Sequence, residues 1–220
     1  MKVVTHACIL PLALGLSACE ATTSQATKTS WQTVEPGYKA GPPSTELEAL
    51  FPLVDGNLYH YRMETLGDQP MPGGMLMMKV HRKSPSEGEL RKPGGNQSFR
   101  FVSDGIATTT KTGSPAFLVK LPFDLQNSWL GPHGGATQFA ELGISVNTPS
   151  GTYAGCHRTR ETVRGDLPKV IVTTLCKDVG IVSLRVEGGG GAEQAELVYY
   201  GPPIDIGPDG VTKEPSTGPQ

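Results

Sequence analysis

Apolar and polar residues alternate in short runs from residue 57 to residue 200, and glycine, proline, asparagine and aspartate separate these runs. The run LYHYRMET at 58–65 alternates in this way, and the run IVSLRVE at 181–187 does the same. A period of two between turn residues indicates half-buried β-strands. We expect about nine strands in an all-β fold, either an antiparallel β-sandwich or an incomplete β-barrel.

Shifts in composition divide the chain into four segments. The expected segments are a signal peptide at 1–18, a tether at 19–45, a β-rich domain at 46–203 and a disordered tail at 204–220. The tether is rich in serine, threonine, alanine and proline, which is typical of a flexible linker. A short helical turn is predicted at 46–51, because two prolines and the capping pattern Thr45-x-x-Glu48 precede it.

The N-terminus has the pattern of an export signal. Lys2 precedes a largely apolar stretch at 3–16, which is shorter than the roughly twenty residues that span a bilayer. The stretch ends in Leu16-Ser17-Ala18-Cys19, which resembles the lipobox of bacterial lipoprotein precursors. The resemblance implies that Cys19 becomes the mature N-terminus and carries acyl chains such as palmitate, and the absence of aspartate after it favours the outer membrane. The alternative is an ordinary cleaved signal with a chance cysteine.

Two cysteines, Cys156 and Cys176, remain once Cys8 is removed with the signal and Cys19 carries lipid. Such a pair forms a disulfide in an oxidising compartment. The turn-like segment RGDLP lies midway between them, so a hairpin centred on it places the two cysteines directly opposite each other. The alternative is two free thiols that bind a metal or form a redox pair, but the sequence contains no C-x-x-C motif.

Three further segments resemble patterns in β-rich bacterial lipoprotein domains of uncharacterised function. They are FPLVDGNLYHY at 51–61, PSGTYAGC at 149–156 and CKDVGIVSLRV at 176–186. This resemblance implies a β-rich fold and a location in the cell envelope, and it brings no activity with it.

Charge and motifs argue against several functional classes. The chain has 19 basic and 21 acidic residues, a net charge of −2, which does not suit nucleic-acid binding. No G-x-S-x-G motif is present, and KTG at 111–113 lacks the S-x-x-K and S-D-N motifs that accompany it in serine β-lactamases. The histidines of the domain are too far apart for a zinc motif; they are His60, His81, His133 and His157. We therefore expect no enzyme, no cofactor and no metal site of local spacing.

Methionine is concentrated in MPGGMLMMKVH at 71–81, which holds four of the six methionines. On a strand, Met75, Met77 and His81 share the face opposite Leu76, Met78 and Val80. Methionine fills irregular core space or forms adaptable binding surfaces, and its thioether also selects Cu(I). The candidate ligand or partner surface consists of Met75, Met77, His81, Tyr59 and Tyr61.

These observations favour a non-enzymatic outer-membrane lipoprotein whose β-domain binds a protein partner or an envelope component. The first alternative is a carrier of a small apolar ligand or lipid on the concave face of the sheet. Its cavity would be lined by residues such as Tyr59, Tyr61, Met63, Met75 and Met77. The second alternative is Cu(I) binding by the methionine-rich strand.

Overall fold

The structure is a computed structural model that describes residues 44–67, 71–189 and 191–204. The predicted signal peptide, Cys19, the tether up to residue 43 and the tail from residue 205 lie outside the described residues. The described elements are α1 (Thr45–Leu50), β1 (Leu58–Leu66), β2 (Met71–Ser84), β3 (Glu87–Lys92), β4 (Gly95–Val102), β5 (Gly105–Thr109), β6 (Pro115–Lys120), β7 (Ser128–Leu130), β8 (Ala136–Thr148), β9 (Gly151–Val163), β10 (Lys169–Cys176), β11 (Gly180–Gly188) and β12 (Gly191–Gly201).

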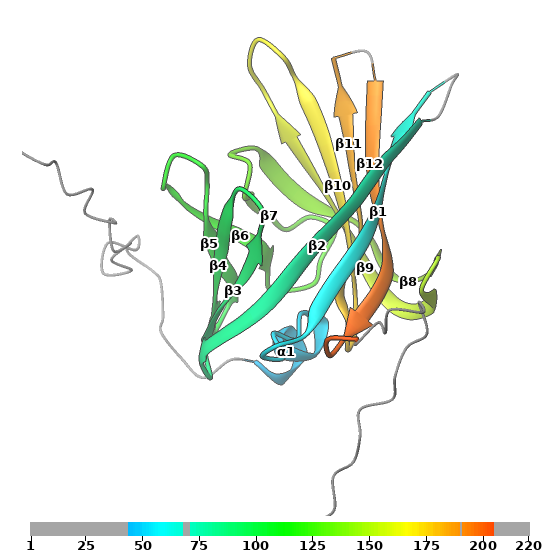
Figure 1. The fold of residues 1–220 in the computed structure, drawn as a ribbon. Coiled ribbons are helices and arrows are strands. Elements are labelled where there is room, and N and C mark those ends of the chain that lie inside the picture. The colour runs from blue at the N-terminus through cyan, green and yellow to red at the C-terminus, as the bar shows by residue number, and fades with distance from the viewer. Residues whose placement is uncertain (1–43, 68–70, 190, 205–220) are drawn as a thin grey trace, which may run out of the picture. The chain divides into compact units, whose positions relative to one another are not determined.

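The twelve strands form one antiparallel sheet, and the barrel alternative is the one that the structure adopts (Figure 1). The strand order is β6-β5-β4-β3-β2-β1-β12-β11-β10-β9-β8-β7, so two six-stranded meanders join where β1 pairs with β12. The edge strands β6 and β7 meet, because the Trp129 indole Nε1 on β7 donates a hydrogen bond to the Phe117 carbonyl on β6 at 3.0 Å. The sheet is therefore nearly closed.

Aromatic and aliphatic side chains fill the end of the barrel that lies beside α1. Leu47 and Leu50 of α1 are buried together with Phe51, which directly follows the helix. The Tyr59 hydroxyl donates to the Val179 carbonyl at 2.6 Å, and the Tyr61 hydroxyl donates to the Ile181 carbonyl at 2.8 Å. Burial raises the pKa of both tyrosines, so both hydroxyls stay protonated and act as donors.

The structure differs from the sequence predictions in two details of this fold. The described residues form twelve strands rather than about nine, and β3 and β7 carry little alternation, since EGELRK contains a single large apolar residue and SWL has three residues. The helix cap was also predicted wrongly: Ser44 is the N-cap and makes no side-chain capping bond. Such a short helix is stabilised by the burial of its leucines rather than by its cap.

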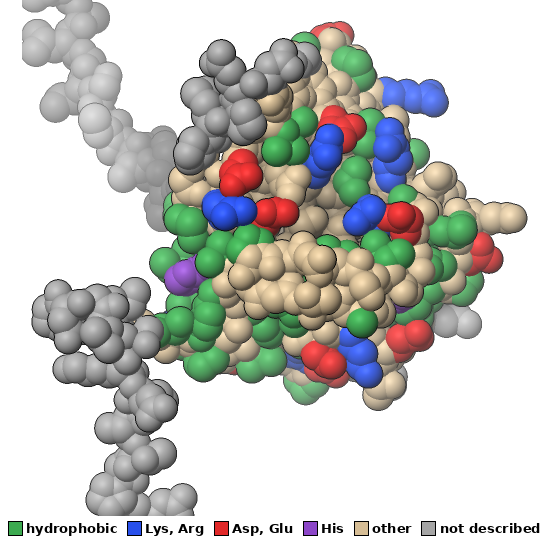
Figure 2. Space-filling model, turned by 90° about the vertical axis from the view of Figure 1, so that its right-hand side faces the viewer, with side chains coloured by type: hydrophobic (Ala, Val, Ile, Leu, Met, Phe, Trp, Pro, Cys, Tyr) green, Lys and Arg blue, Asp and Glu red, His purple; other side chains and the backbone are tan. Residues whose placement is uncertain are grey.

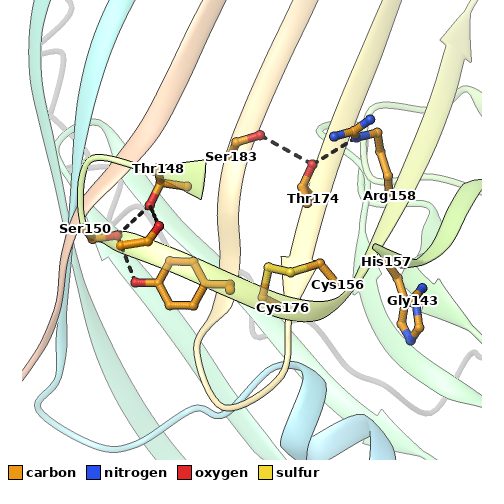
Figure 3. Close-up of a disulfide and its surroundings, with 11 residues drawn as sticks. Gly143, Thr148, Ser150, Cys156, His157, Arg158, Thr174, Cys176 and Ser183 are labelled. Carbon is orange, nitrogen blue, oxygen red and sulfur yellow. Dashed lines mark hydrogen bonds between the residues drawn. A yellow bond between two sulfur atoms is a disulfide. The ribbon is translucent and has the colours of Figure 1, made fainter. Parts of the chain in front are cut away.

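The disulfide between Cys156 and Cys176 is confirmed, with an S–S distance of 2.04 Å. Leu175 pairs with His157 in the β9–β10 ladder, so the next residues on each strand face each other as the hairpin register predicts. Figure 3 shows this disulfide with the outer part of the β8–β9 hairpin beside it. That part of the hairpin reaches β12, where the Ser150 amide donates to the Leu197 carbonyl at 3.1 Å. We call this part of the hairpin, residues 143–155, the ledge.

Candidate functional site: the cavity inside the barrel

The candidate surface predicted from the sequence is divided between the two faces of the sheet. Tyr59 pairs with Met78, and Tyr61 pairs with Leu76. Directly opposed residues of antiparallel strands point to the same face. Both tyrosines are buried in the core, so they do not join the exposed methionines in one surface.

The other three residues lie on the outer face of β2. Met75 and Met77 are 62% and 52% exposed, as the alternation of strand 71–84 predicts. His81 lies further along the strand, with its Nδ1 atom 3.3 Å from the Asp55 carboxylate. The structure therefore brings Met75 and Met77 together and leaves His81 in a separate contact with Asp55.

A cavity of about 160 Å³ does lie inside the barrel, but residues other than those predicted line it. The cavity lies next to the buried Tyr59 and Tyr61. Leu76, which pairs with Tyr61, and Ile181, whose carbonyl accepts the Tyr61 hydroxyl, both line its wall. Most of the wall is apolar. The apolar lining residues are Leu76, Met78, Leu90, Phe99, Leu118, Pro132, Ile181 and Leu184.

One side of the cavity is polar. Threonines and a glutamate of β8, β9 and β10 point inward there, and all are buried: Thr137, Thr159, Glu161 and Thr173. The Thr137 hydroxyl has no hydrogen-bond partner, although its side chain is only 2% exposed. A buried hydroxyl without a partner costs free energy, typically about 1–3 kcal/mol. Thr137 therefore holds an unused donor and acceptor in the wall of the cavity.

Glu161 holds the loop 131–135, which covers this side of the cavity, in place by hydrogen bonds. Its Oε1 atom accepts hydrogen bonds from the amides of His133 and Gly135 at 2.9 and 2.8 Å, and its Oε2 atom lies 2.8 Å from His133 Nδ1. The loop approaches so closely that a Cβ atom on Gly131 would lie 2.1 Å from the Thr137 hydroxyl. The glycine is required by this approach, and the carboxylate determines the position of the loop.

The Glu161 carboxylate and the His133 imidazole form a pair in the wall of the cavity. A carboxylate and an imidazole held at hydrogen-bond distance are two of the three parts of a hydrolase triad. The third part would be a hydroxyl bonded to that imidazole, and the Thr137 hydroxyl makes no such bond.

The sequence contains a signal for this cavity that alternation alone does not reveal. Thr137 and Thr159 have the same inward parity as Phe139, which is buried in the core. Polarity on a strand usually marks the solvent face, so alternation alone does not identify these threonines as part of an internal wall. Several inward polar residues on neighbouring strands indicate an internal polar wall.

A second hollow, a groove of about 530 Å³, lies on the outer face of β8 to β12. Figure 2 shows basic and acidic side chains interspersed around a hollow on the side of the barrel that carries β12 and the ledge. The groove is lined by Ala140, Glu141, Arg158, Arg160, Val172, Thr174, Ser183, Arg185, Glu187 and Gln194.

Two of the three arginines that line this groove form ion pairs, and the third, Arg160, does not within the described part of the chain. Arg158 pairs with Glu141, and Arg185 pairs with Glu187 at 2.8 Å. No side chain among the described residues pairs with Arg160, which is exposed. The mostly polar lining and the unpaired guanidinium of Arg160 together suit a polar partner with negative charge.

Clustered metal ligands of these types and membrane-spanning helices are both absent from the described residues. The described residues contain no group of three or more histidines, cysteines, aspartates or glutamates placed to hold a metal ion. No helix in that part of the chain is long and apolar enough to cross a membrane.

Comparison with known proteins gives a fold and no function. No protein-family model matches the chain, and no curated protein matches it. A crystal structure of a candidate lipoprotein from Parabacteroides distasonis matches 69% of this chain and 98% of its own, with a TM-score of 0.50 and 12% identity. A candidate exported protein with a YmcC-like fold from Bacteroides fragilis has the same coverage, a TM-score of 0.46 and 11% identity. The first likeness shows that this nearly closed sheet also occurs in another protein.

Proposed function

We propose that this protein is a non-enzymatic lipoprotein of the cell envelope whose barrel binds one small, mainly apolar ligand with a single hydrogen-bonding group. The observation that carries the proposal is the unpartnered Thr137 hydroxyl in a cavity with mostly apolar walls. The resemblance of Leu16-Ser17-Ala18-Cys19 to a lipobox supports attachment to the outer membrane by acyl chains on Cys19, since two or more chains anchor a protein stably.

The size of the cavity limits the ligand. An apolar cavity of about 150 Å³ holds one benzene molecule, so 160 Å³ suits a single ring or a short alkyl chain. A whole lipid does not fit in that volume. The exposed Lys92 at the opening lets the polar end of a slightly longer ligand meet a positive charge.

Phenol and toluene test the proposal, because they share a ring and differ in the hydroxyl group. The wild-type chain is expected to bind phenol about fivefold more tightly than toluene. This ratio corresponds to the net free energy of one hydrogen bond to Thr137. In Thr137→Val the preference is expected to reverse, since the phenol hydroxyl then loses its partner. Isothermal titration calorimetry measures both affinities.

Two further variants complete this test. Leu184→Trp fills the cavity and is expected to abolish binding of both compounds, with the fold checked by circular dichroism. Thr174→Val removes a buried hydroxyl from the outer face and is expected to leave both affinities unchanged. Wild-type binding that survives Leu184→Trp would place the ligand outside the cavity and contradict the proposal.

Binding of a protein partner or an envelope component on the outer face is the second candidate function. The observation in its favour is the groove above the ledge, where Arg160 is unpaired. A photo-crosslinking residue in place of Val172, on the groove floor, is expected to form an adduct in intact cells. Arg160→Glu should reduce its yield, while the exposed Lys111→Glu should not. Equal yields in all three proteins would exclude recognition by charge in this groove.

A further inference from the structure

Three side chains on the outer face of β1 and β2 form a cluster that the proposed function does not use. The strand register places Met77 directly opposite His60, and Met75 opposite Arg62. Directly opposed Cβ atoms lie about 5 Å apart, and diagonal neighbours lie about 7–8 Å apart. Both thioethers are thus within reach of the His60 imidazole.

The His60 imidazole has an unused ligand atom. Its Nε2 atom is buried and has no hydrogen-bond partner. On the β12 side, the ring of Tyr199 meets the imidazole edge to face, with centroids 5.7 Å apart. An aromatic ring therefore borders the imidazole on one side, and the methionine strand borders it on the other.

Core packing does not account for the two methionines. Their neighbours Leu76 and Met78 point inward and line the cavity, so these two residues are the apolar side chains that this part of β2 gives to the barrel interior. Met75 and Met77 instead expose their thioethers to solvent, 62% and 52% respectively. Two exposed methionines at alternate positions beside an unpartnered imidazole call for a different explanation.

Thioether and imidazole together form a soft ligand set. Thioethers select Cu(I), and imidazole also binds copper, whereas hard divalent cations prefer oxygen ligands. Arg62, which lies opposite Met75, is offset because it pairs with Glu64 at 2.7 Å and with Glu196 at 3.2 Å. Arg62 therefore adds little net repulsion to a monovalent cation beside Met75.

We propose that Met75, Met77 and His60 bind one soft monovalent metal ion, Cu(I) or Ag(I). The site differs from the set expected from the sequence, which included His81. His81 is engaged with Asp55 and lies four residues beyond Met77 on the strand, roughly 13 Å away at about 3.3 Å per residue. The third ligand comes from the neighbouring strand.

Silver(I) titration of the full chain, labelled with ¹³C at the methionine methyl groups, tests the site. All proteins carry Cys8→Ser and Cys19→Ser, so that no free thiol competes for the metal. One equivalent of Ag(I) is expected to shift the methyl signals of Met75 and Met77 and to leave those of Met63 and Met78 in place. Single methionine-to-leucine variants assign the signals, and nuclear magnetic resonance reads them.

Two matched histidine variants decide the outcome. His60→Asn is expected to weaken Ag(I) binding by about tenfold or more, while His81→Asn leaves it unchanged. The double variant Met75→Leu and Met77→Leu is expected to lose the site and keep the wild-type circular dichroism spectrum. The proposal is overturned if Ag(I) does not shift the two methyl signals with a one-to-one endpoint. It is equally overturned if His60→Asn binds as the wild type does.

Discussion

Removal of the Cys156–Cys176 disulfide is expected to lower the free energy of unfolding by about 3 kcal/mol. Urea denaturation of the double variant Cys156→Ala and Cys176→Ala, compared with the wild type, measures this loss. The two cysteines are 20 residues apart, and closing a loop of that length restricts the unfolded chain by about that amount. Both cysteines are fully buried, so the lost sulfur contacts add to the effect.

A reduction experiment provides the control for this prediction. Dithiothreitol is expected to bring the wild-type chain close to the stability of the double variant and to leave the double variant itself unchanged. A difference below about 1 kcal/mol between oxidised wild type and double variant would show that the unfolded chain is already compact around this loop.

The disulfide also lies where the ledge leaves the barrel. Gly143 and Gly155, at the two ends of the ledge, both adopt a left-handed backbone with a φ of +67°. Ile144 pairs with Cys156, so the covalent link lies next to the first residues of the bend. We therefore expect the double variant to loosen the ledge and the outer groove before the rest of the sheet.

Local patterns in the sequence were sufficient for the strands that alternate and for the disulfide. The register of a hairpin follows from the position of its turn, so RGDLP determines the pairing of the two cysteines. The outward face of Met75 and Met77 follows from the period of two along one strand. Such features depend on residues that are close together in the sequence or on one hairpin.

Features that depend on how several strands pack together could not be predicted from the sequence. The division of Tyr59, Tyr61 and the methionines between two faces requires the register of β1 against β2, which no turn of defined length reveals. The path of the ledge depends on a contact between Ser150 and Leu197, far apart in the sequence. Residues from eight strands and one loop line the cavity, so it forms only when the whole sheet has closed. Its polar wall also departs from the usual rule that polar residues on a strand face solvent.

Replacement of Glu161 by leucine is expected to lower the free energy of unfolding by about 3 kcal/mol or more. The carboxylate accepts two backbone amides and contacts an imidazole, and it is only 4% exposed. Leucine leaves those donors without an acceptor, and each buried donor left unpaired costs about 1–3 kcal/mol. Urea denaturation measures the loss, and the phenol titration should show weakened binding because the loop that covers the cavity is no longer fastened.

Two matched variants separate the role of Glu161 from a general effect of losing a glutamate. Glu141→Leu removes an exposed carboxylate that pairs with Arg158 on the outer face of the same strand pair, and its cost is expected to stay below about 1 kcal/mol. Glu161→Gln keeps an oxygen that can accept the His133 and Gly135 amides, so its cost should fall between the two leucine variants. If Glu161→Leu were no more destabilising than Glu141→Leu, the loop would be held by its own backbone bonds between Gly131 and Gly135. The cavity would then keep its wall without the carboxylate, and Thr137 alone would account for its preference for phenol over toluene.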